Sequence, residues 1–106
     1  MAGVITGNVQ SLSVVSVTLS PTIVNTITAG EQTFTVPGVL ATDVVLSVNK
    51  PSAQAGLGIA GARVTAANTV GITFVNPTAG NITPTASETY KFILARPDST
   101  QAGFNV

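Results

Sequence analysis

The first charged side chain in this sequence is Glu31, so the first thirty residues carry no charge. Ser, Thr and Asn interrupt every apolar run in this stretch, which makes it too polar for a membrane span. Two segments within it, 11–19 and 22–28, are rich in β-branched residues and predict strands. Strands without charges pair readily with open strand edges. We therefore expect this part of the chain to be covered by its own sheets or by neighbours in an assembly.

The composition narrows the class of protein further. The 106 residues predict one domain with a single modest core. Only 8% of the residues are charged, against about a quarter in an average protein. The four Lys and Arg residues are too few for a phosphate-binding stripe, so we expect no nucleic-acid partner. We see no secretion signal and no membrane-spanning run, so we expect no membrane partner and synthesis without export.

The residues that usually perform catalysis are scarce. The sequence has no Cys and no His, which excludes disulfides, thiol nucleophiles and imidazole bases and removes the usual zinc ligands. Only Lys50 and Lys91 remain as bases for a serine nucleophile, and neither lies in a Ser-x-x-Lys motif. The carboxylates occur beside turns and strand ends, as solvated charges do: Glu31, Asp43, Glu88 and Asp98. We therefore predict no enzyme, no cofactor and no metal.

One short glycine motif matches a nucleotide-binding pattern. The segment Gly56-Leu57-Gly58-Ile59-Ala60-Gly61 has the spacing G-x-G-x-x-G. The dinucleotide fingerprint also needs a following helix and an acidic residue about 20 positions on. Here β-branched residues follow, and Asn81 stands near the acidic position. The motif therefore predicts a glycine-rich loop where chain segments approach closely.

Alternation of apolar and polar residues predicts an all-β fold. Thr occurs 16 times and Val 15 times, and no window has sustained helical periodicity. About seven to eight strands in one antiparallel β-sandwich fit this spacing, with a small β-barrel as the alternative. The expected strands are 11–19, 22–28, 32–36, 43–48, 59–65, 69–74 and 89–94, and the Thr- and Pro-rich segment 81–87 is expected to be extended. We assign residues 1–10 to an N-terminal arm and residues 11–106 to the sandwich domain.

Local details of this pattern predict bulges, turns and core residues. The alternation slips at Val14-Val15, which predicts a β-bulge there. We expect turns at 29–31 and 66–68, and a type II turn at Pro37-Gly38. The residues of the first strand expected in the core are Leu12, Val14, Val17 and Leu19.

The segment from Gln32 to Arg96 resembles a known family. Its distinctive parts are Thr33-Phe34-Thr35-Val36-Pro37-Gly38, then Ala41-Thr42-Asp43-Val44-Val45, and then the long run from Gly61 to Pro84. In this order they resemble a family of small bacteriophage virion proteins that are encoded with head genes and taken to be capsid decoration (cement) proteins. The resemblance covers about 65 of the 106 residues. The family has no catalytic residues that could be transferred to this chain.

The resemblance implies a structural function in the virion. It implies a β-sandwich, made in the bacterial host cytoplasm, that binds the outer surface of the capsid and bridges neighbouring major capsid subunits. The implied partners are the major capsid protein and other copies of the chain, as a homotrimer or another oligomer near local symmetry axes. We expect assembly contacts at Val4, Ile5, Arg63, Lys91 and Phe104. Residues 1–10 would then be a capsid-contacting or subunit-swapping arm, by our own inference.

Two of these expected contacts rest on charge. Arg63 and Lys91 lie in strand-like segments with polar neighbours. Either they point outward and discourage edge pairing, or they form ion pairs between subunits, for instance with Glu88 or Asp43. A second function also fits the sequence: a phage tail or tail-fibre module that recognises a host surface glycan. Exposed aromatic residues would be the sign of such a glycan site.

Overall fold

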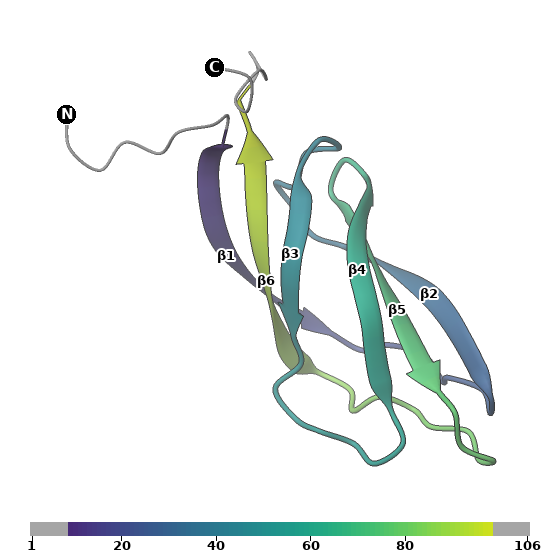
Figure 1. Cartoon of the computed structure of the whole chain (residues 1–106). Coiled ribbons are helices and arrows are strands. Elements are labelled where there is room, and N and C mark those ends of the chain that lie inside the picture. Colours follow the sequence, from purple (N-terminus) through teal and green to yellow (C-terminus); the bar gives the residue numbers. More distant parts are fainter. Residues whose placement is uncertain (1–8, 99–106) are drawn as a thin grey trace.

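Six strands form the described part of the protein. The computed structural model describes residues 9–98, which contain two antiparallel three-stranded sheets and no helix (Figure 1). The strands are β1 (Val9–Leu19), β2 (Thr28–Thr35), β3 (Val44–Asn49), β4 (Gly58–Ala66), β5 (Thr69–Asn76) and β6 (Glu88–Pro97). One sheet has the order β1-β6-β3 and the other β2-β5-β4. The all-β prediction is confirmed, but the prediction of seven to eight strands is wrong.

The predicted strand at 22–28 is absent as a strand. Segments 22–28 and 81–87 share one isolated bridge, between Val24 and Ile82, and the Thr26 N–H also donates to the Asn81 side chain. At the bridge, the backbone N–H of each residue donates to the carbonyl of the other, at 2.7 and 3.0 Å. After the bridge the first segment turns at Thr26-Ile27, where Ile27 has a left-handed backbone with φ of 49°, and leads into β2. Both segments are therefore extended connections that close one end of the fold.

The core lies between the inner faces of the two sheets. The central strands supply the largest buried side chains, and each does so at every second residue, as the alternation predicts. The core residues are Leu19, Val24, Val36, Val39, Val70, Ile72, Phe74, Tyr90, Phe92 and Leu94. Because β5 and β6 are central, one apolar face of each sheet is buried against the other.

The predicted bulge in the first strand is wrong. The pairing of β1 with β6 is regular from Ser11 to Leu19, and the register shifts only between Val9 and Ser11. β1 begins at Val9, so the last two residues of the predicted arm, Val9 and Gln10, lie in this strand. Residues 1–8 lie outside the described residues.

This regular register reverses two predicted core residues. Val17 and Leu19 pack on or in the core as predicted, together with Val15. Because side chains alternate between faces, Leu12 and Val14 must then point outward. They are 64% and 67% exposed. With no bulge to shift the phase, the second half of the strand determines which face the first half presents.

Two of the three predicted turns are present in the structure. Gly38 has a φ of +94°, which fits the type II turn predicted at Pro37-Gly38. A turn at Ala67-Asn68 joins β4 to β5, and the Asn68 side chain accepts a hydrogen bond from the Gly38 N–H at 2.8 Å. The turn predicted at 29–31 is wrong, because β2 runs through it and pairs Gly30 with Phe74.

The two sheets meet along one pair of edges. β3 and β4 are edge strands of different sheets, and they lie side by side (Figure 1). The loop from 50 to 57 joins them. The other edge strands of the two sheets, β1 and β2, therefore lie far apart from each other.

Candidate functional site

The outer face of the β1-β6-β3 sheet is apolar along the half that includes the start of β1. Leu12 and Val44 flank Ala95 in one row, and Val14 and Ser47 flank Ile93 in the next. Leu46 stands at a register shift in β3 and is 58% exposed. We call this set the apolar face: Leu12, Val14, Val44, Leu46, Ile93 and Ala95. The remaining half of the same side is polar: Ser16, Thr18, Asn49, Thr89 and Lys91.

A signal for the apolar face exists in the sequence, but our sequence analysis missed it. All three strands of this sheet contain consecutive apolar residues: Val14-Val15, Val44-Val45-Leu46 and Phe92-Ile93-Leu94. A strand with consecutive apolar residues is apolar on both faces, as expected when both faces are covered. By contrast, β2 has its large apolar residue, Phe34, between Thr33 and Thr35.

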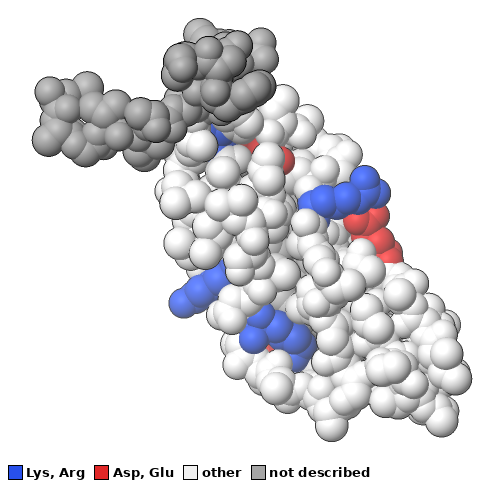
Figure 2. Space-filling model, in the orientation of Figure 1, with Lys and Arg blue, Asp and Glu red and all other residues white. Residues whose placement is uncertain are grey.

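The outer face of the other sheet has different chemistry. Glu31 on β2 reaches across the middle strand to Arg63 on β4, with Arg63 Nε and Glu31 Oε2 2.8 Å apart. The carboxylate lies where a side chain on Gly71 would stand, since a Cβ there would come within 2.5 Å of it. The hydrogen bond from Arg63 lowers the pKa of Glu31. This face therefore carries an internal ion pair over small residues, and Figure 2 shows how sparse charge is on the side it views.

A second ion pair, between the buried carboxylate of Asp43 and the partly exposed guanidinium of Arg96, lies at the end of the fold that includes the start of β1. The guanidinium of Arg96 donates to both carboxylate oxygens of Asp43, at 2.9 Å each, and also to the Gly38 carbonyl. These bonds from Arg96, together with the Leu40 N–H, lower the pKa of Asp43 against the opposing effect of burial. A cleft of about 240 Å³ lies beside the pair, lined by Ser11, Ser13, Val15, Pro37, Gly38, Val39, Asp43, Leu94 and Arg96.

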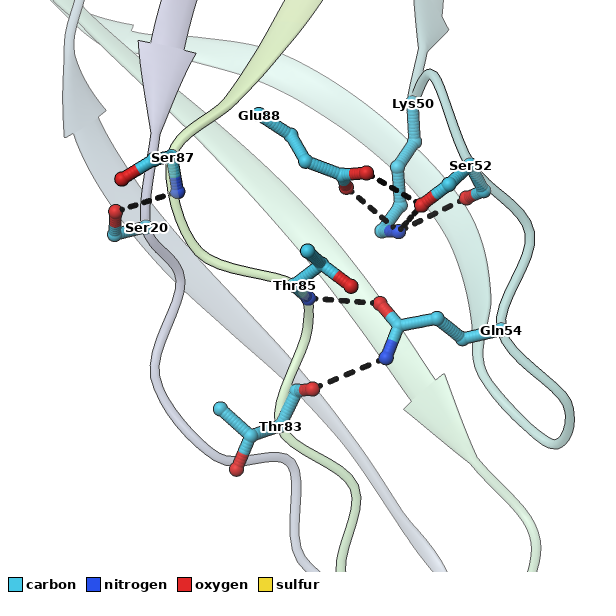
Figure 3. Close-up of polar contacts among 8 residues, drawn as sticks. All are labelled: Ser20, Lys50, Ser52, Gln54, Thr83, Thr85, Ser87 and Glu88. Atoms are coloured by element: carbon cyan, nitrogen blue, oxygen red, sulfur yellow. Dashed lines mark hydrogen bonds and ion pairs between the residues drawn. The ribbon is translucent and has the colours of Figure 1, made fainter.

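The third ion pair fastens the 50–57 loop to β6. Lys50 Nζ lies 2.9 Å from Glu88 Oε1 and donates to Ser52 Oγ at 3.1 Å, while the Ser52 hydroxyl donates to Glu88 (Figure 3). The hydrogen bond from Ser52 and then that from Lys50 lower the pKa of Glu88. Lys50 acts only as a donor here, so it cannot take the proton of Ser52 as a catalytic base would. The trio is a clamp between two segments.

Acid is expected to destabilise the protein through these pairs. The folded pKa values of Glu31, Asp43 and Glu88 are all lowered. Such groups stabilise the fold above their unfolded pKa values of about 4, and that contribution is lost as the pH falls through the lower folded values. Urea midpoints should therefore fall steeply below about pH 4.5. A Glu31→Gln variant should show a shallower fall, and a native midpoint that stays constant down to about pH 3 would contradict the expectation.

Within residues 9–98, Tyr90 has a buried hydroxyl with no hydrogen-bond partner. Its whole side chain is fully buried. Tyr90→Phe is therefore expected to leave stability at neutral pH unchanged or to raise it by up to about 1 kcal/mol. Burial raises the pKa of Tyr90 to about 12. Because Tyr90 ionises near pH 10 in the unfolded chain, the free energy of unfolding of the native chain falls as the pH rises from about 10 towards 12. Urea melts at pH 7 and pH 11 should show the variant gaining relative to the native chain at pH 11; a marked loss at pH 7 would contradict this.

The predicted assembly residues have different outcomes. Arg63 is engaged by Glu31, while Glu88 and Asp43, the partners that we considered between subunits, are held by Lys50 and Arg96 within the chain. Lys91 lies exposed in the polar half of the outer side of β6. The other expected contacts lie outside the described residues: Val4, Ile5 and Phe104. Their roles in assembly stay predictions.

Other candidate chemistry is absent from the described residues. The glycine motif at 56–61 runs from a loop into β4, and no helix follows it. Residues 9–98 contain no cluster of three or more acidic, Cys or His side chains able to hold a metal ion. Within the same range we find no helix with the length and apolarity needed to cross a membrane.

Comparisons of the chain with protein-family models, with curated proteins and with solved structures found no match.

Proposed function

We propose that this protein is a structural virion protein that binds the outer surface of a phage capsid and stabilises the head by bridging neighbouring major capsid subunits. The apolar face is the observation that carries the binding part of this proposal. It exposes five large aliphatic side chains on one side of one sheet: Leu12, Val14, Val44, Leu46 and Ile93. Contiguous exposed apolar residues mark surfaces that another protein covers. The phage context comes from the resemblance of residues 32–96.

The charges support a binding function that needs no chemistry. Among the described residues, Lys50, Glu88, Arg63, Glu31, Arg96 and Asp43 are held in ion pairs within the chain, so these charges are already compensated and oppose burial in an interface less. Repeated copies on a shell add avidity to a contact of modest area. Glycan recognition has less support, because Phe74, Tyr90 and Phe92 are fully buried and Phe34 is half-buried.

The test is binding to undecorated phage heads. Purified protein should sediment with the heads and raise the temperature at which they are disrupted. No binding and an unchanged disruption temperature would contradict the proposed function. Glycan-array hits without head binding would favour the tail-fibre alternative.

A matched pair of variants tests the face itself. Val14→Lys places a charge on the apolar face, and we expect head binding at least about tenfold weaker from the lost burial. Thr35→Lys adds the same charge on an exposed position of β2 and should bind as the native chain does. Both positions are exposed, so neither change should unfold the protein. Equal binding by both variants would show that the apolar face is not the contact.

A further inference from the structure

Three of the four edge strands carry a device that hinders pairing with another chain. β3 and β4 lie beside each other at the seam between the sheets, and the pairing of each is interrupted by register shifts. β2 carries the charge of Glu31, and the side-chain amide of Gln32 bonds the N–H and carbonyl of Thr22, at 2.8 and 3.0 Å. Bulges, charges and covering segments are the usual means of protecting a sheet edge.

From Ser11 to Leu19, β1 has none of these devices, since its register shift lies between Val9 and Ser11. It is 11 residues long and has no charge, no proline and a regular register from Ser11 to Leu19. Among the described residues it pairs with β6 alone, so the N–H and C=O groups on its other side have no ladder partner. Such an edge is a template for an added strand.

We propose that β1 pairs antiparallel with β1 of a second copy of this chain. An antiparallel pair of identical strands lies on a two-fold axis, so one contact surface serves both subunits. β1 carries no charge, so two copies pair without like-charge repulsion. A charged partner could form no ion pair with this strand.

The side chains indicate the register of this pair. With Ser13 on the two-fold axis, Leu12 of each copy stands opposite Val14 of the other, on the same outer side of the joined sheet. Aliphatic residues then meet aliphatic residues across the interface. The two apolar faces become one continuous band across six strands.

The proposal of this pairing rests on the exposed edge of β1 and does not depend on the proposed function. It would double the apolar area that one particle offers to a capsid. It predicts a two-fold dimer and not the homotrimer expected from the resemblance, so these two oligomers are separable by mass.

A single introduced cysteine tests the pairing in the full chain, which has no native Cys. In Ser13→Cys the two Cα atoms would lie about 4.5–5.5 Å apart, within the range that a disulfide spans. Thr18→Cys, on the same strand, would lie about 17 Å from the axis and should not link. Ser47→Cys, on the outer side of β3, would link only if the sheets stacked face to face.

Sedimentation equilibrium of the native chain gives an independent measurement. We expect twice the 10.6 kDa of one chain in the micromolar range, with β1 amide protons exchanging more slowly as concentration rises. We expect the oxidised Ser13→Cys dimer to exceed the Thr18→Cys dimer at least about tenfold, given the separations. A monomer or trimer by mass, or linkage at Ser47 in place of Ser13, would overturn the pairing whether or not the protein binds heads.

Discussion

The substitution Asn76→Asp is expected to lower the free energy of unfolding by about 3 kcal/mol or more. Asn76 is fully buried at the end of β5. Its amide group donates to the carbonyls of Val24 and Gly80, at 3.1 and 2.8 Å. Its carbonyl oxygen accepts from the N–H and hydroxyl of Thr78, at 3.0 and 2.6 Å. A carboxylate would lose both donors and face two carbonyl oxygens in a buried site.

A neighbouring asparagine provides the control. Asn81 is exposed, and its side-chain oxygen accepts from the Thr26 N–H at 2.9 Å. Asn81→Asp keeps that acceptor and should change stability by less than about 0.5 kcal/mol. Urea unfolding of the two variants at pH 7 makes the comparison. If Asn76→Asp were within about 0.5 kcal/mol of the native chain, the network around Asn76 would not hold this end of the fold together.

Phe92→Ala is expected to destabilise the fold by about 4 kcal/mol, while Ile93→Ala at the next position should lose less than about 1 kcal/mol. Phe92 is fully buried between the sheets, so its removal leaves a cavity as well as losing apolar burial. Ile93 is 36% exposed on the opposite face. Because total stability is typically about 5–15 kcal/mol, the first variant should have a greatly reduced urea midpoint.

The pair also separates folding from binding. Ile93→Ala should weaken attachment to heads while the fold remains intact, since Ile93 belongs to the apolar face. Equal losses of stability from Phe92→Ala and Ile93→Ala would contradict the assignment of inner and outer faces in β6.

Much of the candidate site was beyond prediction from separate segments. Glu31 and Arg63 are 32 residues apart in the sequence. They come together because β2 and β4 both pair with β5, one on each side of it. Asp43 and Arg96 are 53 residues apart and meet because β3 pairs directly with β6. Charge-pair geometry depends on which strands are neighbours, and sequence alternation does not specify strand order. Arg63 was recognised as a candidate contact, but its partner was not.

The apolar face could have been recognised in part. The slip at Val14-Val15 predicts a bulge, with Leu12 and Val14 in the core together with Val17 and Leu19. The other interpretation, a regular strand that is apolar on both sides, was available from the similar runs in 44–46 and 92–94. Whether β1 has a bulge or a regular register depends on how it pairs with β6, and that pairing is regular from Ser11 to Leu19.

The sequence by itself determined the all-β class, the inward faces of β5 and β6, and the turn at Pro37-Gly38. These features follow from period-two alternation and from backbone preferences, which act between near neighbours. Only the tertiary structure decided the face of β1 that is buried. Val15, Val17 and Leu19 pack on or in the core, whereas Ser11 and Ser13 line the cleft beside the 37–43 segment. Burial of the second half therefore sets the phase of the whole strand and turns Leu12 and Val14 outward, because one regular register cannot bury both.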